Sequence, residues 1–232
     1  MSKTIAAPSP MSRRVTSILS RIEYRVATDE HERERIYRLR YDAYLREAAI
    51  HENESMRLAD GFDASPNSAL FGIYLDDLLI ASIRLHIVDR HARSSPAAQA
   101  FPDRLGPLID DGFRFVDPNR FVVDRSVGRH LPELPYVVLR LPFMAAGYFN
   151  ADFVTATVRQ EHGAFYGKIL RCHHVCDPRS YPTLIKPLGL MMVNYPDEHG
   201  NVLSRHPCFA ARPGETESLF RHIRTGAANT LA

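Results

Sequence analysis

Apolar residues recur at helical spacing in two long segments. In residues 30–47 the period follows Thr28 and Asp29, either of which is a suitable N-cap. The repeating positions there are Ile36, Leu39 and Ala43. In residues 133–149 they are Leu134, Val137, Val138, Leu141 and Ala145. Both segments are therefore predicted to form helices, and Pro142 is expected to kink the second one.

Runs of β-branched and aromatic residues predict strands between these helices. The predicted strands cover residues 23–27, 70–75, 78–88, 121–124, 153–158, 173–176 and 187–194, and a further helix covers residues 161–170. Asp76 and Asp77 join two of the strands, which indicates a hairpin, although Asp-Asp is a weaker turn signal than Asp-Gly. This order of elements predicts an α/β (α+β) domain, with helices flanking a mixed sheet.

Polar segments interrupt the periodic ones. Residues 1–20 are rich in Ser, Pro and Ala, so a mobile arm with about one helical turn near residues 15–19 is expected. Residues 21–232 are then expected to form a single domain. Residues 51–68 predict an irregular surface loop, and residues 89–118 predict a long polar connection.

Composition and missing motifs exclude several classes of protein. The chain of 232 residues is 45% hydrophobic and 24% charged, with a net charge of +2 and scattered basic residues, so a nucleic-acid partner is not expected. It contains no apolar run long enough for a membrane span or a secretory signal, so a soluble, cytoplasmic protein is expected. The dinucleotide, Walker and GxSxG motifs are absent from the sequence.

One ordered set of polar and aromatic residues resembles a known family. It begins with RYDAY (residues 40–44) and DGFD (60–63), continues with the hairpin that contains Arg84, and ends with DPNRFVVD (117–124). In this order and spacing the pieces resemble the acyl-homoserine-lactone synthases and the related N-acyl amino acid synthases, a branch of the GNAT acyltransferases. The resemblance covers about residues 22–195.

The resemblance implies a GNAT fold with splayed central strands and a bacterial, cytoplasmic acyltransferase. It implies three catalytic positions, Asp117, Arg120 and Phe121. It also implies substrate-binding positions at Arg40, Tyr44, Asp60, Asp63, Arg84, Val122 and Val123. The expected partners are an acyl carrier protein and an amino acid, with membrane contact only through the lipid product. The acyl-phosphopantetheine of the carrier would be a co-substrate, and no permanently bound cofactor or metal is expected.

Two departures from the lactone synthases refine this expectation. Those enzymes usually carry Glu where this chain has Asp117, so its carboxylate is one methylene shorter. Residues 158–181 and 186–195 look like the N-acyl amino acid synthases rather than the branch that binds S-adenosylmethionine. An amino-acid acceptor is therefore preferred. A lactone synthase and a non-catalytic lipid-binding or carrier-binding module with the same fold are the alternatives.

The chemistry of amide formation suits these residues. A thioester reacts with a neutral amine, so a carboxylate must accept the proton of the ammonium group, directly or through water, and Asp117 is the candidate base. In a GNAT the oxyanion is typically met by a backbone N–H where the strands part, which implicates residues 121–123. Arg40 and Arg84 are expected to clamp the acceptor carboxylate.

Structural interpretations of the same residues remain open at this stage. Asp60 and Asp63 also suit turn caps, Arg84 suits a buried charge pair, and Asp117 before Pro118 suits the start of a turn. Four further apolar residues, Phe143, Met144, Phe149 and Phe153, would line an acyl tunnel or simply fill the core, and the core is favoured.

Three cysteines invite a metal or disulfide interpretation, which their spacing does not favour. Cys172, His174 and Cys176 would share a face of a strand, but the second close pair of ligands typical of structural zinc sites is missing. Cys208 is distant in the sequence. Reduced, buried thiols are therefore expected.

Overall fold

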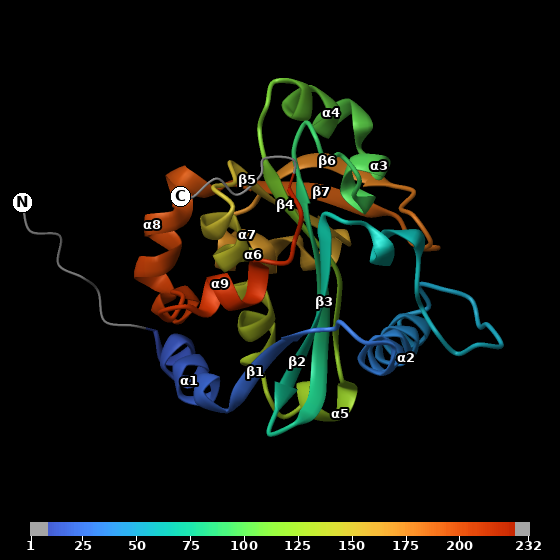
Figure 1. Ribbon diagram of the computed structural model, residues 1–232, viewed down its shortest axis with the longest axis vertical. Helices are drawn as coiled ribbons and strands as arrows, with labels where there is room; N and C mark the ends of the chain where they lie inside the picture. Colours follow the sequence, from blue (N-terminus) through green and yellow to red (C-terminus); the bar gives the residue numbers. More distant parts are fainter. Residues whose placement is uncertain (1–8, 226–232) are drawn as a thin grey trace, which may run out of the picture.

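The computed structural model describes residues 9–225, in which helices surround one central sheet (Figure 1). The strands are β1 (Ile22–Val26), β2 (Ser68–Leu75), β3 (Leu78–Val88), β4 (Phe115–Val123), β5 (Phe153–Val158), β6 (His173–Arg179) and β7 (Leu188–Asn194). The α-helices are α1 (Pro10–Ile18), α2 (Glu30–Arg46), α3 (Pro96–Ala100), α4 (Pro102–Asp110), α5 (Arg125–Gly128), α6 (Leu134–Tyr148), α7 (Gly163–Leu170), α8 (Tyr195–Arg205) and α9 (Glu215–Phe220). The predicted elements are all present within a few residues of their expected bounds, β4 being the one that is much longer than expected.

The sheet is mixed, and its two central strands separate. Its strand order is β1-β2-β3-β4-β5-β7-β6, with antiparallel pairing throughout except between β4 and β5. These two parallel strands pair only at Phe115 with Phe153 and at Val116 with Val154. Beyond Val116 they diverge, which opens a wedge in the middle of the sheet. The mixed sheet with splayed central strands confirms the predicted fold class.

The β2–β3 hairpin closes through the turn that the sequence indicated. Asp76 and Asp77 have φ angles of 47° and 65°, the left-handed conformation that a two-residue type I′ turn requires at both central positions. Asp tolerates this conformation better than most residues with a Cβ atom. The turn sets the pairs Leu75–Leu78 and Tyr74–Leu79, and a shift of register at the next position then places Arg84 opposite Leu70.

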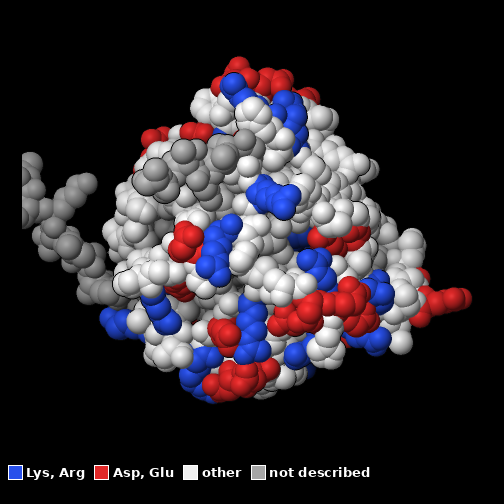
Figure 2. All heavy atoms as spheres, in the orientation of Figure 1, with Lys and Arg blue, Asp and Glu red and all other residues white. Residues whose placement is uncertain are grey.

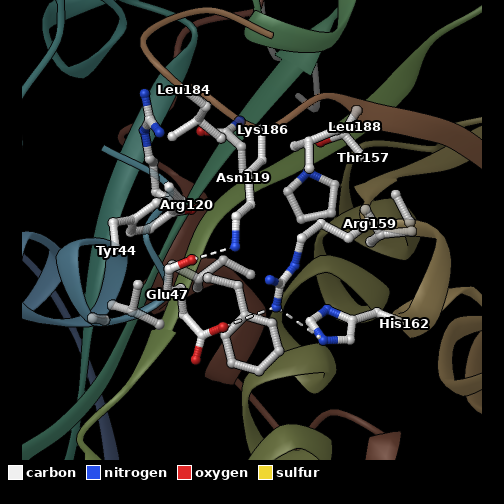
Figure 3. Close-up of a pocket in the computed structure, with 18 of the residues that line it drawn as sticks. Tyr44, Glu47, Asn119, Arg120, Thr157, Arg159, His162, Leu184, Lys186 and Leu188 are labelled. Carbon is white, nitrogen blue, oxygen red and sulfur yellow. Dashed lines mark hydrogen bonds and ion pairs between the residues drawn. The ribbon is translucent and has the colours of Figure 1, made fainter. Parts of the chain in front are cut away.

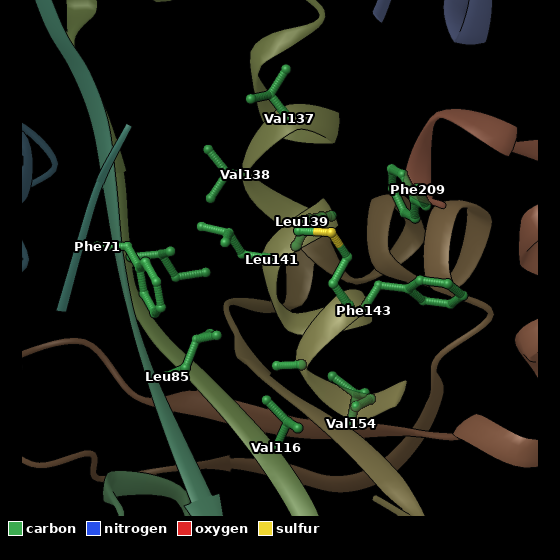
Figure 4. Close-up of a cluster of buried hydrophobic side chains, with 14 of the residues drawn as sticks. Phe71, Leu85, Val116, Val137, Val138, Leu139, Leu141, Phe143, Val154 and Phe209 are labelled. Atoms are coloured by element: carbon green, nitrogen blue, oxygen red, sulfur yellow. The ribbon is translucent and has the colours of Figure 1, made fainter. Parts of the chain in front are cut away.

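Helix α6 forms the centre of the core on one face of the sheet (Figure 4). Its Val138 and Leu141 lie between the helix and Phe71, while Val116 and Val154 come from the two splayed strands. Side chains alternate between faces along β4, because Phe115 packs with α3 and α4 on the opposite face. The helix continues unbroken through Pro142. One helix therefore supports both strands that border the wedge.

The N-terminal segment differs from the mobile arm that was expected. Residues 1–8 lie outside the described residues, but residues 10–18 form α1, capped by the Ser9 side chain. Val15 is fully buried and Leu19 is nearly so, and both belong to the same cluster as α6. Their apolar contacts outweigh the weak helix propensity of a Ser-rich segment, which explains why composition alone misjudged it.

This packing makes Val15 a stability determinant. We expect Val15→Ala to lower the free energy of unfolding by about 2 kcal/mol, because it removes two buried methyl groups. Urea denaturation followed by circular dichroism measures the change. Ser17→Ala is the matched control on the exposed side of α1, with an expected change within about 0.5 kcal/mol. Equal stability of the Val15→Ala variant and the unmodified protein would contradict the observed packing.

Residues 89–118 are also more ordered than the predicted polar connection. They contain α3 and α4, whose buried side chains include Ala97, Phe101, Leu105 and Ile109 at a spacing of four residues. The three prolines within α3 and α4 concealed the period, although Pro96 and Pro102 occupy the first helical positions, where proline is well tolerated. Helices α8 and α9 in the C-terminal segment were likewise not predicted.

Candidate active site

The wedge between β4 and β5 opens into a cavity of about 650 Å³ (Figure 3). Residues 118–123 of β4 and residues 156–158 of β5 form two of its walls. The remaining lining comes from the end of α2, from α6 and α7, and from the segment between β6 and β7. The residues on its apolar side are Ile83, Leu139, Ala156, Val158, Phe165 and Tyr166.

A bulge in β4 directs two predicted site residues into this cavity. The register shifts so that Arg84 lies opposite Asn119 while Ser82 lies opposite Val122, which leaves one extra residue in β4. Arg120 has a φ angle of 54°. This is an unusual, strained conformation for a residue with a long side chain, and such strain is often found at functional sites. Arg120 and Phe121 both line the cavity.

Four other predicted residues form a buried ion-pair network with Arg120. Arg40 contacts Asp63 at 2.8 Å, Arg84 contacts Asp60 at 2.6 Å and Asp63 at 2.8 Å, and Arg120 contacts Asp60 at 2.7 Å. The five side chains are at most 5% exposed. Burial alone would raise the pKa of Asp60, but the hydrogen bonds and charges of Arg84 and Arg120 outweigh it and hold this pKa well below its usual value.

The two loop acids also cap a short turn of helix. Asp60 accepts a hydrogen bond from the backbone N–H of Phe62, and Asp63 accepts one from that of Asp60, both at 3.0 Å. This reciprocal arrangement is a capping box at residues 61–64. Both interpretations of these acids are therefore correct, because each carboxylate accepts hydrogen bonds from a backbone N–H group and from an arginine.

Asp117 lies where the two strands part, but it does not line the cavity. Its carboxylate accepts hydrogen bonds from the backbone N–H of Ala97 and from the hydroxyl of Thr155, both at 3.1 Å. The side chain is fully buried, and burial raises its pKa above the usual value despite these hydrogen bonds. It joins α3 to the beginning of the wedge.

The structure thus divides the predicted site residues into two groups. Tyr44, Arg120, Phe121, Val122 and Val123 line the cavity. The others lie behind its wall, namely Arg40, Asp60, Asp63, Arg84 and Asp117. The expected clamp of Arg40 and Arg84 on an acceptor carboxylate is wrong for this structure, because both guanidinium groups are already paired with the loop acids away from the cavity.

Charged residues that the sequence did not single out surround the cavity. Glu47, at the end of α2, accepts a hydrogen bond from Arg159 at 3.0 Å, and its backbone carbonyl accepts one from Lys186 (Figure 3). His162 contacts Arg159 at 3.3 Å. Three of these residues lie in segments that resemble the N-acyl amino acid synthases, but only the fold shows that their side chains meet beside the cavity. On the face seen in Figure 2, basic and acidic side chains lie interspersed over the surface.

The predicted acyl-tunnel residues fill the core instead. Phe143, Met144 and Phe149 are buried in the cluster around α6, and Phe153 packs against Phe113. None of them lines the cavity. The core interpretation that the sequence favoured is therefore correct.

The cysteines are buried free thiols in the structure. Burial raises the pKa of Cys172 to about 12, which keeps its thiol protonated and unreactive near neutral pH. His174 is exposed and contacts Asp177 at 3.2 Å. Within residues 9–225, no group of three or more His, Cys, Asp or Glu side chains is arranged to hold a metal ion.

The splayed sheet and the cavity between its parallel strands define a protein of the GNAT class. Within that class, the chain belongs to the family described as N-acyl amino acid synthase FeeM, whose model matches residues 35–194. It is therefore an acyltransferase. The match includes every predicted site residue from Arg40 to Val123.

Solved structures agree on the fold. FeeM, an N-acyl amino acid synthase from uncultured soil microbes, is 17% identical with a TM-score of 0.66, over 79% of this chain and 96% of FeeM. The CoA-dependent acyl-homoserine lactone synthase BjaI is 15% identical with a TM-score of 0.53, over 78% of this chain and 88% of BjaI. The acyl-homoserine lactone synthase LasI is 13% identical with a TM-score of 0.50, over 74% of this chain and 89% of LasI.

A search of curated proteins found no match to the sequence. Among residues 9–225, no helix combines the length and the apolar character needed to cross a membrane.

Proposed function

We propose that this acyltransferase moves a fatty acyl group from the thioester of an acyl carrier protein to the amine of an amino acid. The observation that carries the proposal is the cavity in the wedge, which has an apolar side and a charged mouth. An acyl chain and its thioester suit the apolar side, and a zwitterionic acceptor suits the charged residues around it. The proposed site of action is the cytoplasm, with membrane contact only through the lipid product.

The reaction requires a proton acceptor and oxyanion donors beside the cavity. The acceptor ammonium loses a proton, and the neutral amine attacks the thioester carbonyl. The C–S bond then breaks, and the leaving thiolate takes up the second proton that the nitrogen loses as the amide forms. Asp117 is the proposed proton acceptor, and it acts through water because it stands behind the cavity wall. The backbone N–H groups of residues 121–123 are the proposed donors to the oxyanion.

The short helix after β4 favours a carrier protein over coenzyme A as donor. In α5 the N-terminal amides of Ser126 and Val127 already donate to the Asp124 carboxylate, at 2.8 and 3.3 Å. A carboxylate in this position repels a pyrophosphate and occupies the amides that would hold it. The acyl-phosphopantetheine arm of a carrier protein lacks that pyrophosphate.

Mass spectrometry of a reconstituted reaction tests the proposal. We expect purified protein, incubated with a C12 acyl-carrier-protein thioester and each of the twenty amino acids, to form N-acyl amino acids and release carrier thiol in equal amounts. An acyl-homoserine lactone with methylthioadenosine, formed from S-adenosylmethionine, would instead identify a lactone synthase. Bound thioester without thiol release, for every acceptor and with either acyl-CoA or acyl-carrier protein, would identify a binding module.

A further inference from the structure

The geometry points to Arg120 and Tyr181 as the pair that binds the carboxylate of the acceptor amino acid. This inference rests on the proposed function, because it names the part of the acceptor that the cavity recognises. It replaces the clamp of Arg40 and Arg84 that the sequence suggested. Tyr181 was not among the predicted site residues and lies in the segment between β6 and β7.

Arg120 has one donor group without a partner. Its Nε and Nη2 donate to Asp60 at 3.1 and 2.7 Å, and Nη2 also donates to the carbonyl of Pro182 and the hydroxyl of Thr183. Its Nη1 is buried and has no hydrogen-bond partner among residues 9–225. The residue is 4% exposed and lines the cavity. A buried donor of this kind is costly unless an oxygen satisfies it, so a ligand that brings one is favoured.

The charge of the network favours an anion at this donor. Three arginines and two aspartates leave one excess positive charge in the buried group formed by Arg40, Asp60, Asp63, Arg84 and Arg120. Arg120 is the member that reaches the cavity. Because the other guanidinium groups are enclosed, an anionic ligand meets the excess charge at Arg120.

Tyr181 supplies a second donor on the same side of the cavity. The hydroxyl accepts a hydrogen bond from Thr157 at 3.0 Å, which leaves its own proton available for an acceptor in the cavity. Burial raises the pKa of Tyr181 well above 10, so this proton stays in place at neutral pH. The positive charge of Arg120 lies near enough to act on that hydroxyl.

Backbone contacts hold the two donors in one corner. Tyr181, Pro182 and Thr183 are consecutive, and the last two contact Arg120 directly. The bulge in β4 and this segment therefore hold Arg120 and Tyr181 in the same part of the cavity lining. Two neighbouring donors match the two oxygens of a carboxylate. A site that is built to hydrogen-bond one substrate group discriminates strongly against analogues that lack it.

The test compares an amino acid with the amine that lacks its carboxylate. The acceptors are L-phenylalanine and 2-phenylethylamine, or the best amino acid of the twenty and its decarboxylated amine, with C12 acyl-carrier protein as donor. We expect the unmodified protein to have a much higher kcat/KM for the amino acid. Tyr181→Phe is expected to lower that kcat/KM by about 10- to 100-fold, mainly through KM, and to leave the value for the amine unchanged.

Tyr136→Phe is the matched control, because Tyr136 lies on α6 against Phe165 and His206 and does not line the cavity. Arg120→Lys keeps the positive charge but loses the paired donors of the guanidinium group. It is expected to lower kcat/KM for the amino acid and not for the amine. Thermal melting monitored by circular dichroism identifies any variant that fails to fold. If Arg120→Lys does not fold, the kinetics of Tyr181→Phe alone test the inference.

The outcomes separate this inference from the proposed function. If no amide forms with any amino acid or amine, the proposed function fails. If amides form but the unmodified protein uses both acceptors equally, the cavity has no carboxylate site and the inference is overturned. An equal loss for both acceptors in Tyr181→Phe also overturns it, because the residue then serves the reaction in general.

Discussion

Asp60→Ala is expected to lower the free energy of unfolding by about 3–5 kcal/mol, since it leaves two buried arginines without their shared carboxylate. Arg84 and Arg120 are almost fully enclosed, so water cannot replace the lost partner. The change also removes the cap of the turn at residues 61–64. Urea denaturation at neutral pH measures the effect.

An exposed ion pair provides the control for this prediction. Asp110 pairs with Arg93 at the surface, where about half or more of each side chain is exposed. Asp110→Ala is therefore expected to cost only about 0–1 kcal/mol. Similar losses for Asp60→Ala and Asp110→Ala would show that the buried network contributes little to the stability of the fold.

Asp117→Asn is expected to lower kcat for amide formation by about 100-fold or more, as is typical when a general base is removed. The amide oxygen of asparagine can still accept the hydrogen bond from the backbone N–H of Ala97, and the Thr155 hydroxyl can rotate to accept from the amide nitrogen. The variant should therefore fold and bind the carrier protein. Steady-state kinetics with a saturating acceptor measure the loss.

The pH dependence separates a base from a structural residue. Burial raises the pKa of Asp117, so the fraction in its basic form increases as the pH rises through that value. The activity of the unmodified protein is expected to rise with pH over the same range. The pH–activity profile of Asp117→Asn should lack this rise. Unchanged kcat with reduced thermal stability would instead limit Asp117 to holding α3 against the wedge.

Local patterns made much of the fold predictable. The period of α2, the Asp76-Asp77 turn and the β-rich run of β5 each depend on residues close together in the chain. Helices α1, α3 and α4 escaped prediction because their stability comes from packing that sequence alone does not show. Val15 and Phe101, both fully buried, are stabilised by residues distant in the chain.

The candidate site was predictable only in part, for a related reason. The sequence indicated a buried charge pair for Arg84, and the structure places Arg40, Arg84 and Arg120 together on the two loop acids. The sequence could not show which arginine brings an unpaired donor to the lining of the cavity, because that depends on which pairs form in three dimensions. Tyr181 lies in an irregular segment, where no period marks an inward side chain.

The weak joint between β4 and β5 has a consequence for how such enzymes diversify. Two residue pairs link the halves of the sheet, so the width of the gap beyond them is set by the packing of α6, which contacts both strands. A substitution such as Leu141→Met would alter that width without touching any substrate. Under the proposed function, residues of the interior that touch no substrate would therefore influence which acyl chains the cavity accepts.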